Sequence, residues 1–286
     1  MTRELNEEAL ALLEWYALAG VDEAIDETAH NRFCEHEAPP RIVRPEPVSR
    51  PRAEPPPPPR PSAPPSAAPF AAPAAPATMP TPRHAVEEAR ALAAAAASLA
   101  ELEAAVRGFA GCPLKATARN TCFADGNPEA RIMFIGEGPG RDEDIQAKPF
   151  VGRAGQLLDR MLAAIGLDRT SAYITNVVYW RPPANRTPTP DETAVCLPFT
   201  ERQIELVAPD ILVFLGNAAA KHLLAASDGI MRLRGKWKTF RLGGRDYPAM
   251  PTLHPAFLLR QPAHKRLAWA DFLEIKAALD KHSEHA

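Results

Sequence analysis

The residues with the clearest capacity for chemistry are a carboxylate, an aromatic ring, an amide and an imidazole: Glu137, Phe150, Asn176 and His254. Three of them end or follow a short apolar run, and Phe150 follows a glycine-rich turn after the first run. If the runs are parallel strands of one sheet, their carboxyl ends meet at one edge. An amide can pair with the edge of a nucleobase, a ring can stack on its face, and a histidine can stabilise a leaving anion. Together they predict a pocket for a base flipped out of a nucleic acid.

Each residue also has a purely structural interpretation. Asn176 alone would be a buried amide satisfied by the backbone, His254 a loop histidine and Glu137 a turn cap. The turn from Gly136 to Gly140 lacks the Lys-Ser/Thr of a P-loop and the spacing of a dinucleotide-binding turn, which argues against a nucleotide cofactor. The convergence of the set on strand ends favours the functional interpretation.

The order of the predicted elements gives the fold class. Apolar runs alternate with amphipathic segments, which predicts a parallel sheet with helices on both faces. We expect an α/β fold, a three-layer α/β/α arrangement with a central, mostly parallel four-stranded sheet. The expected strands are 132–136, 172–178, 211–215 and 247–253, and the expected helices are 84–108, 153–165, 192–207, a helix from 217, and 264–282.

The segment after the last predicted strand, His254 to Arg260, places apolar residues beside an arginine. It can be the start of an ordinary packed helix. The sharper interpretation is that Leu258 and Leu259 form an apolar wedge that enters a DNA duplex while Arg260 contacts phosphate. Arg153, at the start of a predicted helix, is a further candidate for DNA contact.

Composition divides the chain into three parts. Residues 39–82 hold 18 of the 32 prolines, so a Pro/Ala-rich disordered linker is expected at 38–83. An N-terminal helical segment is expected at 1–37 and the folded domain at 84–286.

The charge is unevenly distributed along the chain. Residues 1–108 carry 10 Lys and Arg against 16 Asp and Glu, whereas residues 109–286 carry 23 Lys and Arg against 19 Asp and Glu. The mildly basic domain permits contact with DNA without requiring it.

The cysteines indicate a reducing compartment. There are four, with no signal-peptide pattern and no long apolar span, so we expect a cytoplasmic protein without disulfides or a membrane segment. We also expect a monomer. A protein partner could bind the N-terminal helix or the Pro-rich linker.

Five spaced motifs carry a family resemblance. They are GEGPGxxED with PFVGRAGQLLDRML, YITNVVxxRPPANRTPTPDE, CxPFxERQIELxxPDxxVxLG and HPAFLLR. In this order they resemble the family-four uracil-DNA glycosylases of the uracil-DNA glycosylase superfamily. The resemblance covers about residues 108 to 280. It implies DNA repair by hydrolysis of the N-glycosidic bond of deoxyuridine, which releases uracil and leaves an abasic site.

The resemblance also implies roles for individual residues. The catalytic positions of the family correspond to Glu137, Glu143 and His254, and the substrate-binding positions to Gly136, Gly138, Phe150 and Asn176. Better-known glycosylases carry a water-orienting aspartate where this chain has Gly138, so Glu137 is the candidate for that task. Which residue activates the water, which bases besides uracil are excised, and which strand form is preferred all stay open.

The chain departs from the family at one place. The family binds a four-iron four-sulfur cluster through four cysteines, and the matching positions here are Phe109, Cys112, Trp180 and Cys196. Because neither Phe nor Trp can bind iron, we expect no cofactor and an apolar plug in its place. The alternative function is a non-catalytic or covalent protein of the same superfamily that binds uracil-DNA or abasic DNA.

Overall fold

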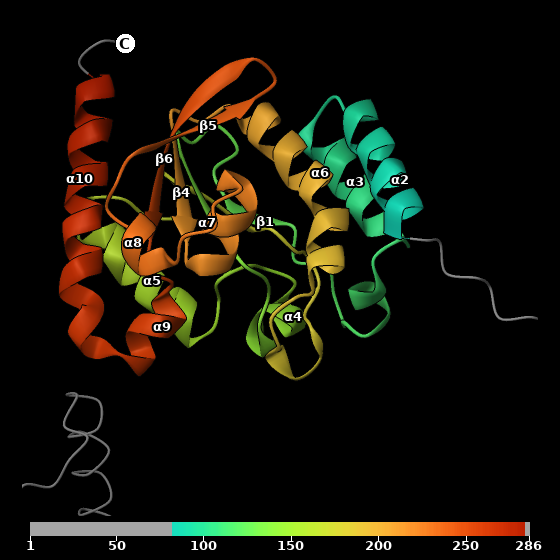
Figure 1. The fold of residues 1–286 in the computed structure, drawn as a ribbon, viewed down its shortest axis with the longest axis horizontal. Helices are drawn as coiled ribbons and strands as arrows, with labels where there is room; N and C mark the ends of the chain where they lie inside the picture. The colour runs from blue at the N-terminus through green and yellow to red at the C-terminus, as the bar shows by residue number, and fades with distance from the viewer. Residues whose placement is uncertain (1–81, 284–286) are drawn as a thin grey trace, which may run out of the picture. The chain divides into compact units, whose positions relative to one another are not determined.

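The computed structural model describes residues 82–283 of the 286 residues (Figure 1). The predictions for the segment 1–37 and for most of the linker lie outside this range. The first described helix begins at Pro82, two positions before the expected start of the domain. None of the helices between Pro82 and Ser283 is long and apolar enough to cross a membrane.

The sheet contains six strands in the order β1-β3-β2-β4-β6-β5. Its four central strands pair in parallel and are the four that the sequence predicts. The expected strand count was too low because both edge strands were missed: β1 has only three residues, and β5 is half exposed and polar. Both edge strands pair antiparallel with their neighbours. The strands are β1 Ala124–Gly126, β2 Ile132–Gly136, β3 Tyr173–Asn176, β4 Ile211–Leu215, β5 Lys238–Leu242 and β6 Arg245–Thr252.

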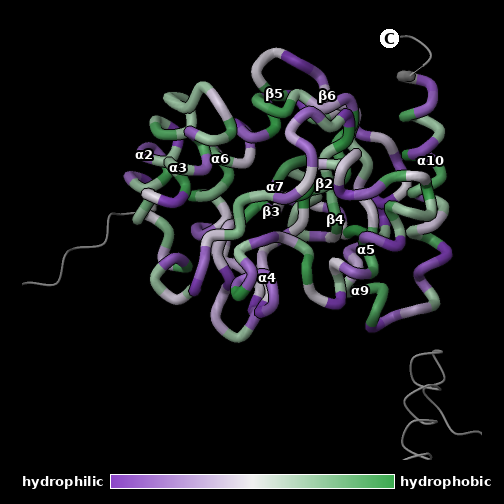
Figure 2. Tube along the Cα trace, turned by 180° about the vertical axis from the view of Figure 1, so that it is seen from behind, coloured by the Kyte–Doolittle hydropathy of each residue, from purple (hydrophilic) through white to green (hydrophobic). Residues whose placement is uncertain are grey.

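Helices cover both faces of the sheet, which confirms the three-layer α/β/α arrangement (Figure 1). Successive side chains of a strand point to opposite faces. Ile132 and Phe134 therefore pack in one cluster with residues of α5 and α10, and Met133 and Ile135 pack in another with residues of α6 and α7. Figure 2 shows β2 and β4 as hydrophobic, as expected for strands buried on both faces. The covering helices are α5 Arg153–Ala163, α6 Pro190–Val207, α7 Asn217–Leu224 and α10 Lys265–Ser283.

The expected helix 84–108 is two helices, α2 (Pro82–Ala95) and α3 (Leu99–Gly108), which pack on α6. The chain breaks before Ser98, whose hydroxyl accepts a hydrogen bond from the Glu101 N–H, while the Glu101 carboxylate accepts one from the Ala97 N–H. This reciprocal cap satisfies N–H groups that a new helix leaves unpaired.

Two short helices, α4 (Arg141–Gln146) and α8 (Ile230–Leu233), were not predicted, and a third, α9 (Pro255–Arg260), is the packed helix that was the alternative for the segment 254–260. Helices of four to six residues hold too few turns for a periodic pattern to stand out. Two of them matter for function, because α4 follows β2 and α9 follows β6. Both lie next to the edge of the sheet where the parallel strands end (Figure 1).

Candidate active site

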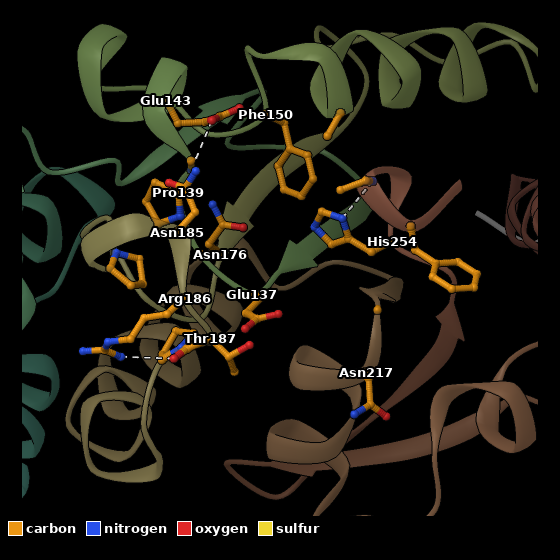
Figure 3. Close-up of a pocket in the computed structure, with 18 of the residues that line it drawn as sticks. Glu137, Pro139, Glu143, Phe150, Asn176, Asn185, Arg186, Thr187, Asn217 and His254 are labelled. Carbon is orange, nitrogen blue, oxygen red and sulfur yellow. Dashed lines mark hydrogen bonds between the residues drawn. The ribbon is translucent and has the colours of Figure 1, made fainter. Parts of the chain in front are cut away.

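A cavity of about 550 Å³ opens at the carboxyl ends of the parallel strands. The structure brings most of the predicted residues to it, from four separate parts of the chain (Figure 3). Gly136 lies directly behind the wall, where a Cβ atom would overlap both the Asn176 side chain and the Phe150 ring. The predicted residues that line the cavity are Glu137, Gly138, Glu143, Phe150, Asn176, His254 and Arg260.

Asn176 supplies an unused hydrogen-bond acceptor at the floor of the cavity. It ends β3 opposite Gly136 of β2 and is 1% exposed. Among the described residues, only two buried side-chain polar atoms lack a hydrogen-bond partner, and Asn176 Oδ1 is one of them. The backbone-satisfied amide that was the structural alternative is therefore not what is found. A buried orphan acceptor is costly, and a ligand that donates a hydrogen bond would remove that cost.

Phe150 forms an aromatic wall of the cavity. Its ring centroid lies 5.5 Å from that of His254, with the two planes inclined by 29°. Its backbone adopts φ +54°, a left-handed conformation that is rare for a bulky residue. The close approach of the ring to β2 depends on Gly136 having no side chain.

The carboxylate of Glu143, predicted as catalytic, is bonded to the backbone of its own region. Its Oε1 atom accepts hydrogen bonds from the N–H groups of Val151 (3.0 Å) and Gly152 (2.9 Å). Its Oε2 atom accepts one from the Gly140 N–H at 3.1 Å. These bonds tie the turn after β2 to the loop that carries Phe150, which supports a positioning role.

His254 is held in one tautomer at the start of α9. Its Nδ1 atom accepts a hydrogen bond from the Ala256 N–H at 3.1 Å, so in the neutral ring the proton is on Nε2. Burial and then the positive charge of Arg260 lower the pKa of His254 to about 4. Gly216, with φ +91°, lets the ring come close, because a Cβ atom there would lie 2.8 Å from that of His254. The imidazole is therefore a neutral donor at ordinary pH.

Glu137 follows the last residue of β2 and lines the cavity mouth. Burial raises its carboxyl pKa above the usual value, and a hydrogen bond with the Thr187 side chain partly opposes this shift. The next residue, Gly138, has no room for a side chain, since a Cβ atom would lie 2.5 Å from Val178 Cγ2. A carboxylate here can orient a water molecule near the other cavity groups.

The loop 181–190 forms one wall of the cavity, and the residue pattern did not predict this. Arg186 is fixed in it by a two-pronged ion pair with Glu192, at 2.6 and 2.8 Å. The position of this Pro-rich loop could have indicated that it lines the cavity, because the loop follows the strand that carries Asn176. Further unpredicted lining residues come from α8 and α9. The lining residues that were missed include Pro182, Asn185, Arg186, Thr187, Pro188, Ile230 and Phe257.

The four predicted DNA-contact residues differ in accessibility. Leu258 is 1% exposed and packs with Leu157 and Leu253, so its predicted role as a wedge is wrong. The reason is that the segment is the helix α9, which turns this position toward the core. Leu259 is half-buried, whereas Arg153 and Arg260 are exposed. Of these four residues only Arg260 lines the cavity.

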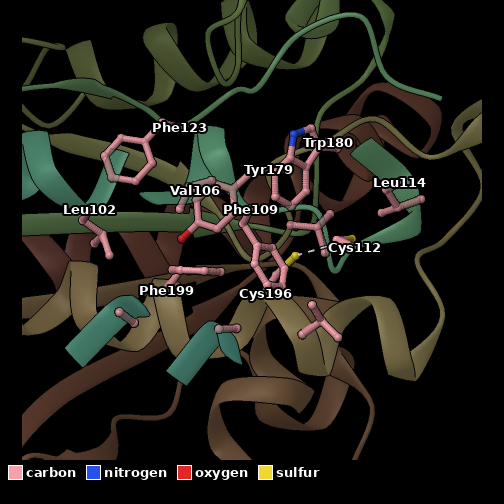
Figure 4. Packing of buried hydrophobic residues seen from close by; sticks show 14 of the residues in the cluster. Leu102, Val106, Phe109, Cys112, Leu114, Phe123, Tyr179, Trp180, Cys196 and Phe199 are labelled. Carbon is pink, nitrogen blue, oxygen red and sulfur yellow. Dashed lines mark hydrogen bonds between the residues drawn. The ribbon is translucent and has the colours of Figure 1, made fainter. Parts of the chain in front are cut away.

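The positions of the family's cluster ligands lie in one buried apolar group between α3, α6 and the chain after β3 (Figure 4). The two thiols, Cys112 and Cys196, lie 4.0 Å apart and form no disulfide. Phe109 packs edge-on against Phe199, and the Trp180 indole donates a hydrogen bond to the Thr121 hydroxyl at 3.0 Å.

This donor set does not fit a four-iron four-sulfur cluster. Such a cluster needs four ligands, and aromatic rings occupy two of the positions. Between Pro82 and Ser283 no group of three or more His, Cys, Asp or Glu side chains could hold a metal ion. The third thiol, Cys122, donates instead to the Glu143 carbonyl oxygen at 3.1 Å. The apolar plug that the sequence predicts is therefore present at these positions.

Comparison with known proteins agrees with this site. Residues 123–273 match the family described as the uracil DNA glycosylase superfamily. The chain is 41% identical to the type-4 uracil-DNA glycosylase of Saccharolobus solfataricus, over 61% of this chain and 83% of that protein. It is 41% identical to that of Thermotoga maritima (62% and 92%) and 42% identical to that of Archaeoglobus fulgidus (57% and 84%). The chain belongs to the uracil-DNA glycosylase superfamily.

Proposed function

We propose that this protein is a DNA repair glycosylase that hydrolyses the N-glycosidic bond of deoxyuridine in DNA, releasing uracil and leaving an abasic site. The observation that carries the proposal is the unpartnered Oδ1 atom of Asn176 beside the Phe150 ring in the cavity. Uracil offers an N3–H donor next to its O4 acceptor, and an amide side chain matches this pair with one acceptor and one donor. A flipped uracil stacked on Phe150 would satisfy the orphan atom.

The same groups account for base selection. Cytosine presents an acceptor at N3 and a donor at its exocyclic amine, the reverse of uracil, so it would meet Asn176 with mismatched groups. This discrimination requires that the amide keep one orientation. Unpaired buried polar groups typically cost about 1–3 kcal/mol each, which is enough to set a preference. The C5 methyl group of thymine would crowd the pocket near Phe150.

The chemical step needs stabilisation of a leaving anion. When the bond between C1′ and N1 breaks, its electrons pass to uracil and negative charge grows at O2. The neutral His254 ring donates its Nε2–H toward that oxygen, and such fixed donors act most strongly in a water-poor site. Glu137 orients the water whose oxygen bonds to C1′, and its carboxylate stabilises the positive charge that develops on the sugar. The proton that this water loses neutralises the departing uracil anion.

The first experiment incubates the protein with an oligonucleotide that contains one deoxyuridine and then adds alkali, which breaks the strand at an abasic site. Release of uracil and a broken strand are expected, with oligonucleotides that contain only cytosine or thymine left intact. A stable shifted complex without free uracil would instead indicate a binding protein. A complex of protein and DNA that survives denaturation would indicate that the protein binds the DNA covalently.

We also propose that the protein acts as a cytoplasmic monomer. The three cysteines within residues 82–283 are free thiols, as expected in a reducing compartment. We further propose, from composition alone, that a protein partner binds residues 1–37 or the linker. Sedimentation with and without a uracil-containing duplex tests the monomer.

A further inference from the structure

The peptide that joins Phe150 to Val151 is held from both of its ends. Its N–H group, on Val151, donates to Glu143 Oε1 at 3.0 Å. Its carbonyl oxygen, on Phe150, accepts a hydrogen bond from the Arg169 guanidinium. The left-handed backbone of Phe150 (φ +54°) is unfavourable for this residue by itself, so surrounding contacts must impose it.

Arg169 is itself fixed by acceptors from other parts of the fold. Its Nη1 atom donates to Asp125 of β1 at 2.6 Å, and its Nε atom donates to Asp159 of α5 at 2.8 Å. The same Nη1 atom lies 3.3 Å from the carbonyl oxygen of Pro149. The guanidinium thus connects β1, α5 and two consecutive carbonyls of the Phe150 loop. Its planar set of donors suits such an arrangement, which a single ammonium group could not reproduce.

The turn that presents Arg169 is also well ordered by hydrogen bonds. Asp168 Oδ1 accepts from the N–H groups of Thr170 (2.8 Å) and Ser171 (3.1 Å). The Ser171 hydroxyl in turn accepts from the Asp168 N–H at 2.8 Å. These hydrogen bonds therefore fix the backbone from which the Arg169 side chain extends.

A second contact fixes the direction of the Phe150 carbonyl. Gly155 in α5 lies so close that a Cβ atom there would overlap the carbonyl group. The carbonyl fits because this helix position has no side chain, and it points to the place where Arg169 can bind it. The simpler explanation for Arg169, a surface ion pair, accounts for Asp125 and Asp159 but not for the carbonyl contacts.

We propose that Arg169 is a positioning residue that sets the plane of the Phe150 ring, and thereby the face on which uracil stacks. Arg169 does not line the cavity, so it acts through Phe150 and not by touching the base. The inference rests on the function proposed above. It adds a residue from outside the pocket to the set that determines recognition of the base.

A double-mutant cycle between Arg169 and Phe150 tests the proposal. In the wild-type background, Arg169→Gln is expected to lower the single-turnover rate of uracil excision by a factor on the order of 10 to 100. In the Phe150→Ala background the same change should alter the rate by less than about twofold, because the ring that Arg169 positions is gone. An equal loss in both backgrounds would overturn the proposal.

Arg241→Gln is the matched control. Arg241, like Arg169, forms a carboxylate ion pair, here with Asp246 alone at 2.7 and 3.1 Å, but it lies in the β5–β6 hairpin at the edge of the sheet opposite β1. The control should keep the wild-type rate. A loss as large as that of Arg169→Gln would mean that removing any such ion pair disturbs the enzyme, and would reject the specific role of Arg169.

Two further measurements keep the outcome clear. If Arg169→Gln does not fold, Arg169→Lys takes its place in the cycle and is expected to lose rate in the same direction, since lysine cannot reach all four acceptors. Titration with free uracil separates this inference from the proposed function. If the wild-type protein binds uracil but does not excise it, the proposed function fails. The positioning role is still supported in that case if the Arg169 variant binds uracil more weakly than wild type when Phe150 is present, and no more weakly when Phe150 is replaced by alanine.

Discussion

The rings of Phe150 and His254 are stacked, with centroids 5.5 Å apart and planes inclined by 29°. A base inserted between them would need about 3.5 Å on each side, about 7 Å in all. The imidazole must therefore meet a bound base at its edge while the phenyl ring takes its face. This arrangement divides recognition from chemistry, because stacking holds the base and the edge contact acts on the charge that develops at O2.

His254→Ala should reduce the chemical step and leave DNA affinity nearly unchanged. The Nε2–H donor acts on charge that exists only in the transition state, so removal of one such donor is expected to cost about 10²–10³-fold in rate. Single-turnover rates and binding of a non-cleavable uracil analogue in duplex DNA separate the two effects. The control is His222→Ala on the exposed face of α7. A variant that loses affinity but keeps its rate would show that His254 only holds the loop.

Asn176→Asp should weaken excision of uracil by about 1–3 kcal/mol or more. The carboxylate keeps the acceptor for N3–H but loses the donor for O4. Rates on uracil- and cytosine-containing oligonucleotides should show lower selectivity, since a carboxyl oxygen can accept from the cytosine amine. Full activity with unchanged selectivity would place Asn176 outside the recognition of the base.

Protonation of His254 should not change the rate of the chemical step near pH 6.5, the ordinary pKa of histidine. His254, with a pKa of about 4, stays neutral above that value. Burial raises the pKa of Glu137, so its carboxylate is present at higher pH and is lost first as the pH falls. Single-turnover rates should therefore show no step from His254 at neutral pH and should decline on the acid side as Glu137 takes up a proton. Glu137→Gln should be slow and should lack this decline, and an inflection near pH 6.5 that vanishes in His254→Ala would contradict the assignment.

Protein purified without oxygen should be colourless, active and free of stoichiometric iron and sulfide. The reason is the ligand set, because only Cys112 and Cys196 among the four matching positions can bind iron. Iron and sulfide assays with a visible absorption spectrum measure this directly. Stoichiometric iron with broad blue absorption would show that other ligands complete a cluster.

Ala208→Gly should stabilise the fold. Ala208 ends α6 with φ +48°, a left-handed position where glycine avoids the steric cost, and it is exposed. A gain of about 1 kcal/mol corresponds to a rise in melting temperature of about 2–4 °C for a domain of this size. The matched control is Ala164→Gly at the end of α5, where φ is −65° and glycine should destabilise. Equal shifts in both variants would rule out backbone conformation as the cause.

The sequence by itself determined the central sheet and the meeting of the main pocket residues. The central strands β2 and β4 are continuous apolar runs, and the order of the four parallel strands in the chain places Glu137, Asn176 and His254 at one edge. The spacing of the motifs also predicted that Phe150 belongs to the pocket and that two of the four cluster ligands are replaced. The edge strands β1 and β5 were not predicted, because β1 is short and β5 is polar. Such strands form only when a neighbouring strand supplies hydrogen bonds.

The tertiary structure alone decided which side chains act on which. Periodicity could not show that Leu258 turns inward, that the Glu143 carboxylate binds backbone N–H groups, or that Arg169 reaches the Phe150 carbonyl. The loop 181–190 likewise became a cavity wall only through contacts between segments far apart in the chain. Local sequence sets backbone preferences over a few residues, whereas these arrangements depend on packing between distant elements, which no local pattern records.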